Sequence, residues 1–290
     1  MLVAPDQSLD LSIVVATRNR AEKLRRCLEA VAKIESESNW ELVIVDNGST
    51  DDTPSVLEQF RAQASFPVLI TREPIPGLGR ARNAGLEVIR DEIVCFLDDD
   101  CYPAPDYIDQ VLQVFREHDV GYMGGQIRLF DPNDYPLATK VDPNIEFLEP
   151  ASFFTIGTLQ GANMAFRRSV LRAIGGFDCA FGPGSLFNCE DVDACARASL
   201  AGWRGGYFPG PIVFHHHCRQ EQDALPTIKS HRFGEGAYFA KFMFFFPGAR
   251  RRYLYRGLRR LIRTSLGTRH EAWWCLLGMI GCISYRWKSG

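Results

Sequence analysis

The strongest candidates for a chemical role in this 290-residue chain are three consecutive carboxylates, Asp98, Asp99 and Asp100. They follow residues 93–97, a short apolar run with β-branched members that is typical of a buried strand. Carboxylates in such a place are costly unless a cation meets them. Hard oxygen ligands suit Mg²⁺ or Mn²⁺ held jointly with substrate phosphates, so the run predicts a metal site. The alternative is a solvated acidic turn before the helix that starts near Pro105.

A second acidic pair, Glu190 and Asp191, stands where we expect a helix over residues 190–202 to begin. The helix dipole stabilises carboxylates at this end, which is a sufficient structural reason for the pair. The functional interpretation is that one of the two serves as a general base at the mouth of a pocket.

Three histidines in succession, His215, His216 and His217, follow a short strand expected over residues 212–214. In strand geometry His215 and His217 share a face and His216 opposes them. One of that pair could complete a metal site begun by Asp100. A closed zinc site is not expected, because adjacent ligands cannot all turn to one ion.

Apolar segments at regular intervals predict the framework that positions these groups. Alternating strands and helices indicate an α/β fold with a doubly wound, mostly parallel sheet flanked by helices. The strands are expected over residues 11–17, 40–45, 66–71 and 93–97. Polar groups that follow the strands should converge on one crevice at the carboxyl edge of the sheet. Besides the aspartates these groups are Thr17, Arg18, Asn19 and Asp46.

Several of these polar residues also have local explanations. Asp46 either accepts a hydrogen bond from a nucleoside or forms the turn in Asp-Asn-Gly-Ser. Asn19 can cap the helix that follows the first strand. Arg80 and Arg82 open a helix expected over residues 78–90, where they match phosphate oxygens or lie on a solvated face.

The second half of the chain has a less regular pattern, and its C-terminal region differs in composition. A long loop is expected over residues 131–150, and the remaining expected elements are a helix at 107–115, a strand at 121–130, extended segments at 152–156 and 160–166, and a glycine-rich loop at 182–189. Residues 219–290 are expected to form a helical extension.

Within this extension, residues 248–263 are dense in arginine and free of acids. Leu254, Leu258, Leu261 and Ile262 fall on one stripe, the pattern of a basic amphipathic helix at a membrane surface. Residues 272–287 are apolar with aromatics at both ends but short for a span. We expect these helices to make peripheral contact with an anionic membrane. The alternatives are packing on the preceding part of the chain and a homodimer interface.

Composition excludes some classes of function. The net charge of −2 carries no nucleic-acid signature, so no nucleic-acid partner is expected. Nine scattered cysteines without a CxxC pair indicate reduced thiols and a cytoplasmic protein. Residues 1–10 lack the pattern of a signal peptide, so the membrane contact is expected on the inner face of the cell membrane.

Taken in order, the motifs resemble those of the family 2 glycosyltransferases, which have the GT-A fold. The likeness covers roughly residues 10–217, and the matching stretches are VVATRNR, IVDNGSTDDT, GLGRARNAGL, the DxD-type FLDDD, GANMAFRR, GGFD and EDVDACARASLAGW. The resemblance implies a GT-A catalytic domain over residues 1–218, with a nucleotide-binding half at about 1–104 and an acceptor-binding half at about 105–218. Residues 219–290 would be the helical C-terminal extension.

The resemblance implies transfer of a sugar, with inversion, from a nucleotide-diphosphate donor to an acceptor hydroxyl in glycan or polysaccharide biosynthesis. The donor is expected to be a UDP-sugar, the cofactor Mn²⁺ or Mg²⁺, and the acceptor a carbohydrate or lipid-linked glycan. The implied catalytic residues are Asp191 as base and Glu190 as its support. The implied donor-binding residues are Thr17, Arg18, Asn19, Asp46, Arg80, Arg82, Asp98, Asp99, Gly161 and Asn163, and the implied metal site draws on Asp98, Asp100, His215 and His217.

The chain departs from the family pattern in two ways. It has three consecutive aspartates where the family motif needs two. The resemblance therefore does not decide which of them binds the metal. It lacks QxxRW after the EDVDACARASLAGW segment, which argues against a processive polysaccharide synthase. Two other functions remain as alternatives. A sugar-1-phosphate nucleotidylyltransferase would require glycines after the first strand, where ATRNRAEK has none. A catalytically inactive sugar-nucleotide-binding subunit would not need the full set of acids that is present.

Overall fold

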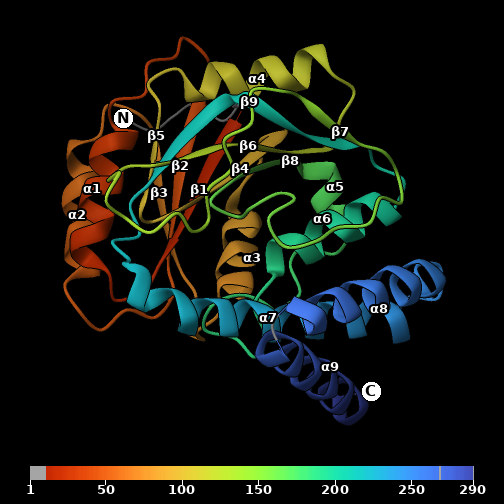
Figure 1. Cartoon of the computed structure of the whole chain (residues 1–290). Coiled ribbons are helices and arrows are strands. Elements are labelled where there is room, and N and C mark those ends of the chain that lie inside the picture. Colours follow the sequence, from red (N-terminus) through yellow and green to blue (C-terminus); the bar gives the residue numbers. More distant parts are fainter. Residues whose placement is uncertain (1–10, 268, 290) are drawn as a thin grey trace.

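The computed structural model describes residues 11–267 and 269–289 (Figure 1). The expectation about a signal peptide falls on residues 1–10, outside this part. Within it, a central sheet of nine strands runs in the order β3-β2-β1-β4-β8-β6-β9-β5, with β7 paired to β9 beside that path. Helices cover both faces of the sheet, and three long helices lie at the C-terminal end.

The first four strands are mutually parallel, as the sequence predicts. They are β1 (Leu11–Thr17), β2 (Trp40–Asp46), β3 (Val68–Arg72) and β4 (Ile93–Asp98). β1 lies between β2 and β4 and pairs with both, and β2 also pairs with β3. The four polar strand ends therefore lie at one edge, which is the physical basis of the site.

Alternate residues of these strands enter two separate cores, because successive side chains point to opposite faces. On one face, Ile13 and Ile44 pack with α1 (Ala21–Val31), α2 (Thr53–Gln63) and α4 (Tyr107–Glu117). On the other face, Val14 and Val45 pack with α3 (Leu78–Val88) and α6 (Glu190–Leu200). A sheet covered on both faces explains why its strands are apolar almost throughout.

The second half of the sheet is mixed in direction. β8 (Asn163–Arg167) runs antiparallel between β4 and β6 (Tyr122–Leu129), and β9 (Gly205–His215) runs parallel to β6. The sequence did not reveal the short strands β5 (Cys101–Pro103) and β7 (Glu146–Leu148), or helix α5 (Arg168–Ala173). β7 lies inside the expected long loop, whereas segment 152–156 forms no strand. The two short strands β5 and β7 depend on pairing with β9, which local periodicity does not report.

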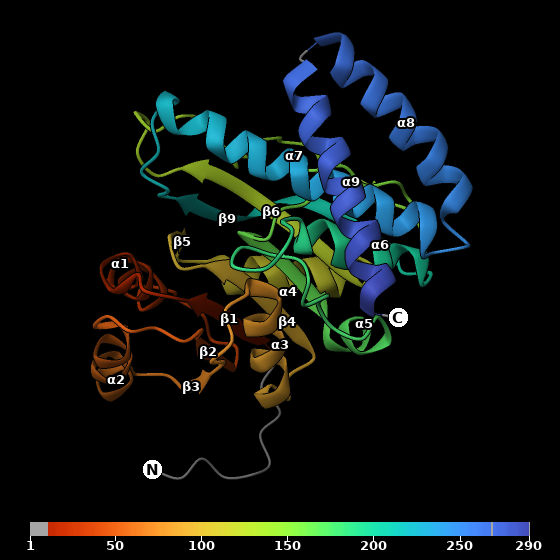
Figure 2. The same ribbon diagram turned by 90° about the horizontal axis from the view of Figure 1, so that it is seen from below.

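The C-terminal helices are α7 (Glu221–Phe244), α8 (Arg250–Gly267) and α9 (Arg269–Ser289). Figure 1 shows α7 lying along one side of the sheet, with α9 on the far side of α7. Glycines allow α7 and α9 to meet backbone to backbone, since a Cβ on Gly236 would lie 1.8 Å from the carbonyl oxygen of Cys275. Figure 2 shows α8 and α9 splayed apart at the outside of the molecule.

The helical extension shares a hydrophobic core with the rest of the protein. Tyr238, Phe239 and Tyr253 are fully buried, and they belong to the same cluster as Phe154 and Phe181. Within the described part of the chain, no helix combines the length and the apolar character needed to cross a bilayer.

Candidate active site

A cavity of about 420 Å³ opens at the carboxyl ends of β1 and β4. It is bounded by the ends of these strands, by residues 156–162, by residues 183–192 and by the chain from β9 into α7. Most of the site residues that the sequence predicts lie in its walls. These are Thr17, Arg18, Asp98, Asp99, Asp100, Gly161, Glu190, Asp191 and His215.

The aspartates at the end of β4 are met by two cations that sequence reasoning did not single out. Arg20 places Nη1 2.6 Å from Asp99 Oδ1 and Nη2 2.5 Å from Asp100 Oδ2. Lys23 Nζ lies 3.4 Å from Asp100 Oδ2. The acids are thus neutralised within the protein, so the solvated-turn interpretation of this run is wrong. A signal was available, because Arg20 follows the first strand by three residues.

Asp99 and Asp100 have different electrostatic environments. Burial raises the pKa of Asp99 to about 6, against the opposing charge of Arg20 and a 2.7 Å hydrogen bond from Thr17 Oγ1. Burial acts in the same direction on Asp100, but its hydrogen bond with His215 and the charge of Arg20 outweigh it, so the pKa of Asp100 lies well below its usual range. Asp100 therefore stays ionised to a lower pH than Asp99 does.

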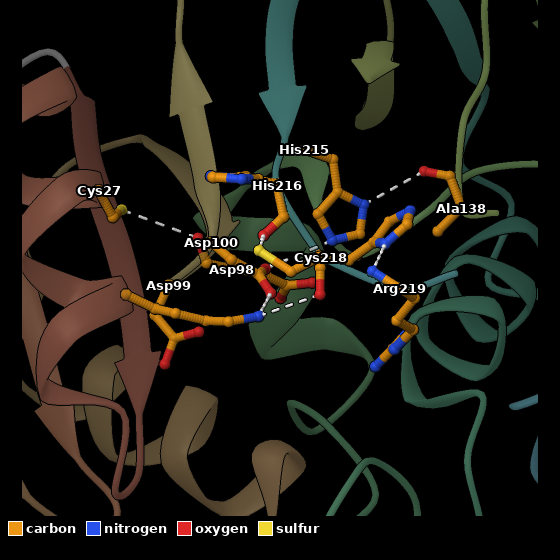
Figure 3. A network of polar contacts seen from close by, with 12 residues as sticks. Cys27, Asp98, Asp99, Asp100, Ala138, His215, His216, Cys218 and Arg219 are labelled. Carbon is orange, nitrogen blue, oxygen red and sulfur yellow. Dashed lines mark hydrogen bonds and ion pairs between the residues drawn. The ribbon is translucent and has the colours of Figure 1, made fainter. Parts of the chain in front are cut away.

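Asp100 and His215 offer ligand atoms for a cation. His215 Nε2 lies 3.3 Å from Asp100 Oδ1, and its Nδ1 lies 3.4 Å from the carbonyl oxygen of Ala138 (Figure 3). With Nδ1–H donating to Ala138, Nε2 is the nitrogen that can bind a metal. Cys101 Sγ completes a group whose ligand atoms lie within 4.8 Å of one another, but burial raises the pKa of that thiol, which disfavours the thiolate. A carboxylate with an imidazole fits a divalent cation such as Mn²⁺.

His217 lies beside His215, as their expected shared face requires. The ring centroids are 5.1 Å apart. His217 Nδ1 accepts a 3.0 Å hydrogen bond from the backbone N–H of Arg219, and its buried Nε2 has no hydrogen-bond partner among the described residues. His216 points elsewhere and pairs with the Tyr102 hydroxyl at 2.9 Å. His215 is thus the histidine in contact with Asp100.

Arg82 takes a different place from the one expected of a diphosphate ligand or a solvated arginine. Its side chain is buried and does not line the cavity. Nη1 donates to Glu190 Oε1 at 2.9 Å, while Nη2 donates to Asp98 Oδ1 at 3.2 Å and to the Gly161 carbonyl at 3.1 Å. Arg82 therefore ties together the walls of the cavity. Arg80, on the same helix, also does not line it.

The two acids at the start of α6 lie in the cavity wall with different surroundings. Asp191 Oδ2 accepts a 2.8 Å hydrogen bond from the backbone N–H of Gly161, which fixes the carboxylate toward the cavity. Burial raises the pKa of Glu190 to about 7, and the charge of Asp191 adds to the shift while Arg82 opposes it. Glu190 is buried, whereas Asp191 is partly exposed to the cavity.

Three predicted donor-binding residues serve the fold and do not line the cavity. Asp46 Oδ1 accepts the Ser49 N–H at 2.8 Å, which is the turn-forming alternative. Asn19 Oδ1 accepts the Thr50 N–H at 2.7 Å. The expectation that Asn19 caps α1 is wrong, because the side chain that receives the Ala21 N–H is that of Asp51.

Asn163, the third of these residues, is completely buried between strands. Its amide donates to the carbonyl oxygens of Gln126 and Pro211, both at 3.0 Å, and its Oδ1 accepts from the Tyr107 hydroxyl at 3.0 Å. Both amide N–H groups of Asn163 are thus engaged within the protein, and its side chain does not line the cavity. Its neighbours Gly161 and Ala162 line the cavity in its place.

The C-terminal extension contributes to the cavity, which the sequence did not predict. Arg219 precedes α7 and His231 lies on it, and both line the cavity. Burial lowers the pKa of His231, while the charge of nearby Asp191 opposes the shift. An adjoining cavity of about 490 Å³ lies between residues 183–188 and α7, and Arg219 and His231 line it too. The side chains of α7 thus border the space beside Asp191.

Comparison with known proteins places this geometry in a family. The sequence model described as glycosyl transferase family 2 matches residues 12–175. Glycosyltransferase AglE of Haloferax volcanii is 27% identical over 227 residues, covering 78% of this chain and 72% of that protein. The pre-mycofactocin glycosyltransferase of Mycobacterium tuberculosis is 28% identical over 221 residues, covering 74% of this chain. This chain spans 44% of that relative, and 53% of an uncharacterized glycosyltransferase of Nostoc that is 28% identical to it.

Solved structures share the fold. A mannosyltransferase from Pyrobaculum calidifontis, in complex with GDP-Man and Mn²⁺, has a TM-score of 0.65 at 17% identity over 96% of this chain and 88% of its own. TarS of S. aureus, in complex with UDP-GlcNAc, has a TM-score of 0.59 at 20% identity, over 81% of this chain and 67% of its own. These likenesses support the GT-A fold. Because the family model covers more than half of the sequence, the chain belongs to glycosyl transferase family 2.

Proposed function

We propose that this protein is an inverting, metal-dependent glycosyltransferase that moves a sugar from a nucleoside diphosphate to an acceptor hydroxyl. The observation that carries the proposal is that one cavity joins the acids at the end of β4 to Asp191 at the start of α6. The first group suits the diphosphate and its cation. The second suits the hydroxyl that attacks the sugar.

The β4 side of the cavity would serve the leaving group. As the bond between the anomeric carbon and the phosphate oxygen breaks, the diphosphate departs with the electron pair and gains negative charge. Asp100 and His215 would hold a divalent cation there, and a bound cation would supply electrostatic stabilisation of that charge. Arg20 and Lys23, which now neutralise Asp100, would remain beside the same phosphates.

Asp191 would accept the proton of the acceptor hydroxyl as the new glycosidic bond forms. Its Oδ2 is oriented by the Gly161 N–H, which leaves the carboxylate fixed for a proton transfer. Attack from the side opposite the diphosphate inverts the anomeric centre. Glu190 supports this arrangement through Arg82, the residue that also contacts Asp98.

The nature of the donor is proposed from the resemblance and from the ligands of the structural neighbours. Those neighbours carry GDP-Man with Mn²⁺ in one case and UDP-GlcNAc in another. We propose a uridine donor and a carbohydrate or lipid-linked glycan acceptor, in non-processive glycan or polysaccharide synthesis. The cavity between residues 183–188 and α7, which adjoins the one that Asp191 lines, would offer a place for the acceptor.

A thermal-shift panel of uridine and guanosine diphosphate sugars, each with Mn²⁺, Mg²⁺ or chelator, tests the proposal. A true donor should raise the melting temperature only when metal is present, because it binds the folded state. The same donor should be slowly hydrolysed by the wild-type protein. Binding without hydrolysis or transfer would favour the catalytically inactive nucleotide-sugar-binding subunit. No shift with any sugar nucleotide would contradict both functions.

A further inference from the structure

Three large apolar side chains of helix α8 point away from the protein, while that of Leu261, expected on the same stripe, lies outside the described part. Leu254, Leu258 and Ile262 recur every four residues and therefore lie on one face, where they are 45%, 46% and 59% exposed. The opposite face carries the buried Tyr253 and Gly257, whose missing side chain allows close approach to Met243. Surface helices normally place their apolar stripe toward the core. The outward stripe of α8 therefore requires an explanation other than internal packing.

Helix α9 has a comparable outward stripe. Four of its exposed apolar side chains share one face, with Trp273 57% and Trp287 85% exposed near the two ends of the helix and Leu276 and Ile280 between them. The opposite face is buried against α7 through Cys275 and Cys282. Figures 1 and 2 both place α8 and α9 at the outside of the molecule. Tryptophan is enriched at the interface between a membrane and water.

The charge on α8 has a single sign. The sequence contains no Asp or Glu between Glu235 and Glu271. Some arginines of α8 serve the fold, since Arg260 Nε lies 3.0 Å from Glu235 Oε1 and Arg250 donates to backbone carbonyls. The side chains of three others are exposed and make no hydrogen bond or ion pair with the described part of the chain, and these are Arg251, Arg252 and Arg259.

One of these arginines lies within the apolar stripe, and the other two lie to one side of it. At 100° per residue, Arg251 falls between Leu258 and Ile262 when the helix is viewed down its axis, and Arg259 and Arg252 lie about 60° and 80° beyond Ile262. On a membrane, arginines without a partner in the protein would attract anionic headgroups, and the neighbouring leucine and isoleucine side chains would move from water into the lipid. Such a combination is found in helices that lie in the headgroup region of a membrane.

We propose that the outward faces of α8 and α9 dock the protein on an anionic lipid bilayer. The helices would lie along the surface, consistent with the absence of a membrane-spanning helix in the described residues. A second copy of this chain fits less well. A two-fold contact through this face would bring Arg251, Arg252 and Arg259 against a second set of the same arginines, and juxtaposed like charges oppose association.

The inference goes beyond the proposed function, since it depends on neither donor nor metal. It does connect the bilayer to the cavity through one rigid element. Helix α7 packs on α9 at Gly236 and also carries His231 in the cavity wall. If α8 and α9 hold the protein on the membrane, the acceptor side of the cavity therefore stays at a fixed distance and orientation relative to the lipid surface.

Co-sedimentation of the full chain with vesicles tests the inference. We expect binding to vesicles of equimolar phosphatidylglycerol and phosphatidylcholine, little binding to phosphatidylcholine alone, and loss of binding with rising salt. Arg251→Glu should weaken binding at least about fivefold, because each basic residue near an anionic surface contributes roughly fivefold and the new carboxylate is repelled. Leu258→Asp should weaken it at least as much. The matched controls are the exposed Arg90→Glu and Val141→Asp, which should bind as the wild type does.

Several outcomes would overturn the docking surface. They are failure of the wild type to bind the anionic vesicles, equal binding to neutral ones, and α8 variants that bind as tightly as their controls. Light scattering decides the remaining case. A dimeric wild type that becomes monomeric in Leu258→Asp, without vesicle binding, would make this face an interface between copies. Each variant should keep the thermal shift with sugar nucleotide, so failure of docking is distinguishable from failure of the proposed activity.

Discussion

Arg82 Nη1 lies 2.9 Å from Glu190 Oε1 behind the cavity wall, although the two residues are 108 positions apart. The same guanidinium lies 3.2 Å from Asp98 Oδ1. One buried cation therefore holds an acid from each side of the cavity. The relative position of the proposed metal side and base side depends on an arginine that does not line the cavity.

Replacement of this arginine should destabilise the protein and disturb the site. Arg82→Met leaves the buried Glu190 and the half-buried Asp98 without their cation, and loss of one partner of a buried pair costs about 3–5 kcal/mol of unfolding free energy. Urea denaturation measures the change. Adding Glu190→Gln to Arg82→Met should restore part of the loss. A double variant no more stable than Arg82→Met would show that the pair does not determine the cost.

Asp191→Asn tests the proposed base. The variant should bind sugar nucleotide with metal as the wild type does, because the amide keeps the size of the side chain. Sugar transfer should fall by about 10²–10⁴-fold, since the amide cannot accept the proton. Turnover with the donor identified by the thermal-shift panel is the measurement. Near-normal transfer would remove Asp191 from this role.

Asp100→Ala and His215→Ala test the proposed cation site by calorimetry. Each change removes a ligand atom of the pair separated by 3.3 Å, so metal-dependent donor binding should be lost in the first and weakened in the second. Asp106→Asn, at an exposed position outside the cavity, is the control and should bind normally. Unchanged affinity of Asp100→Ala with Mn²⁺ present would refute the assignment of this ligand.

Gly236→Ala tests the close contact of α7 with α9. The added Cβ would lie 1.8 Å from the carbonyl oxygen of Cys275, so the helices must separate. We expect a loss of about 1–3 kcal/mol in unfolding free energy, despite the better helix propensity of alanine. Gly248→Ala, where a Cβ meets nothing within 4 Å, should change stability by less than about 0.5 kcal/mol. Equal effects of the two changes would contradict the packing.

The ion pair of Asp178 with Lys241 should make stability depend on pH. Burial acts to raise the pKa of Asp178, but the charge of Lys241, 2.8 Å away, and its hydrogen bond lower it to about 2. The folded pKa lies below the ordinary value of 3.8, so the stabilisation is complete above about pH 4 and is lost as the pH falls toward 2.

Asp178→Asn should therefore lower the free energy of unfolding by about 2 kcal/mol at pH 7 and by less at pH 3. Denaturant titrations of wild type and variant at both pH values measure the difference. Asp106→Asn again serves as the exposed control. A difference between wild type and Asp178→Asn that does not shrink on acidification would show that the carboxylate's charge is not its source.

The sequence alone determined the framework and the acids of the site. The apolar runs of β1, β2 and β4 and the polar residues that end them are local patterns. Parallel strands bring their carboxyl ends to one edge, so Asp98 to Asp100 could be placed there without a structure. The acids of α6 and the helices of the C-terminal extension could also be predicted, because the start of a helix and its periodicity are patterns within short segments of sequence.

Only the tertiary structure decided which side chain meets which. Arg82 is buried because Glu190 and Asp98, from distant parts of the chain, pair with it in the folded protein. The Asn163 amide donates its hydrogen bonds to carbonyl oxygens of β6 and β9. His231 reaches the cavity because α7 packs on α6 and on residues 153–154, which are distant from it in the sequence. Hydrogen bonds and ion pairs of this kind act over a few ångströms in space. Their partners can be any number of residues apart, so no local pattern in the sequence reports them.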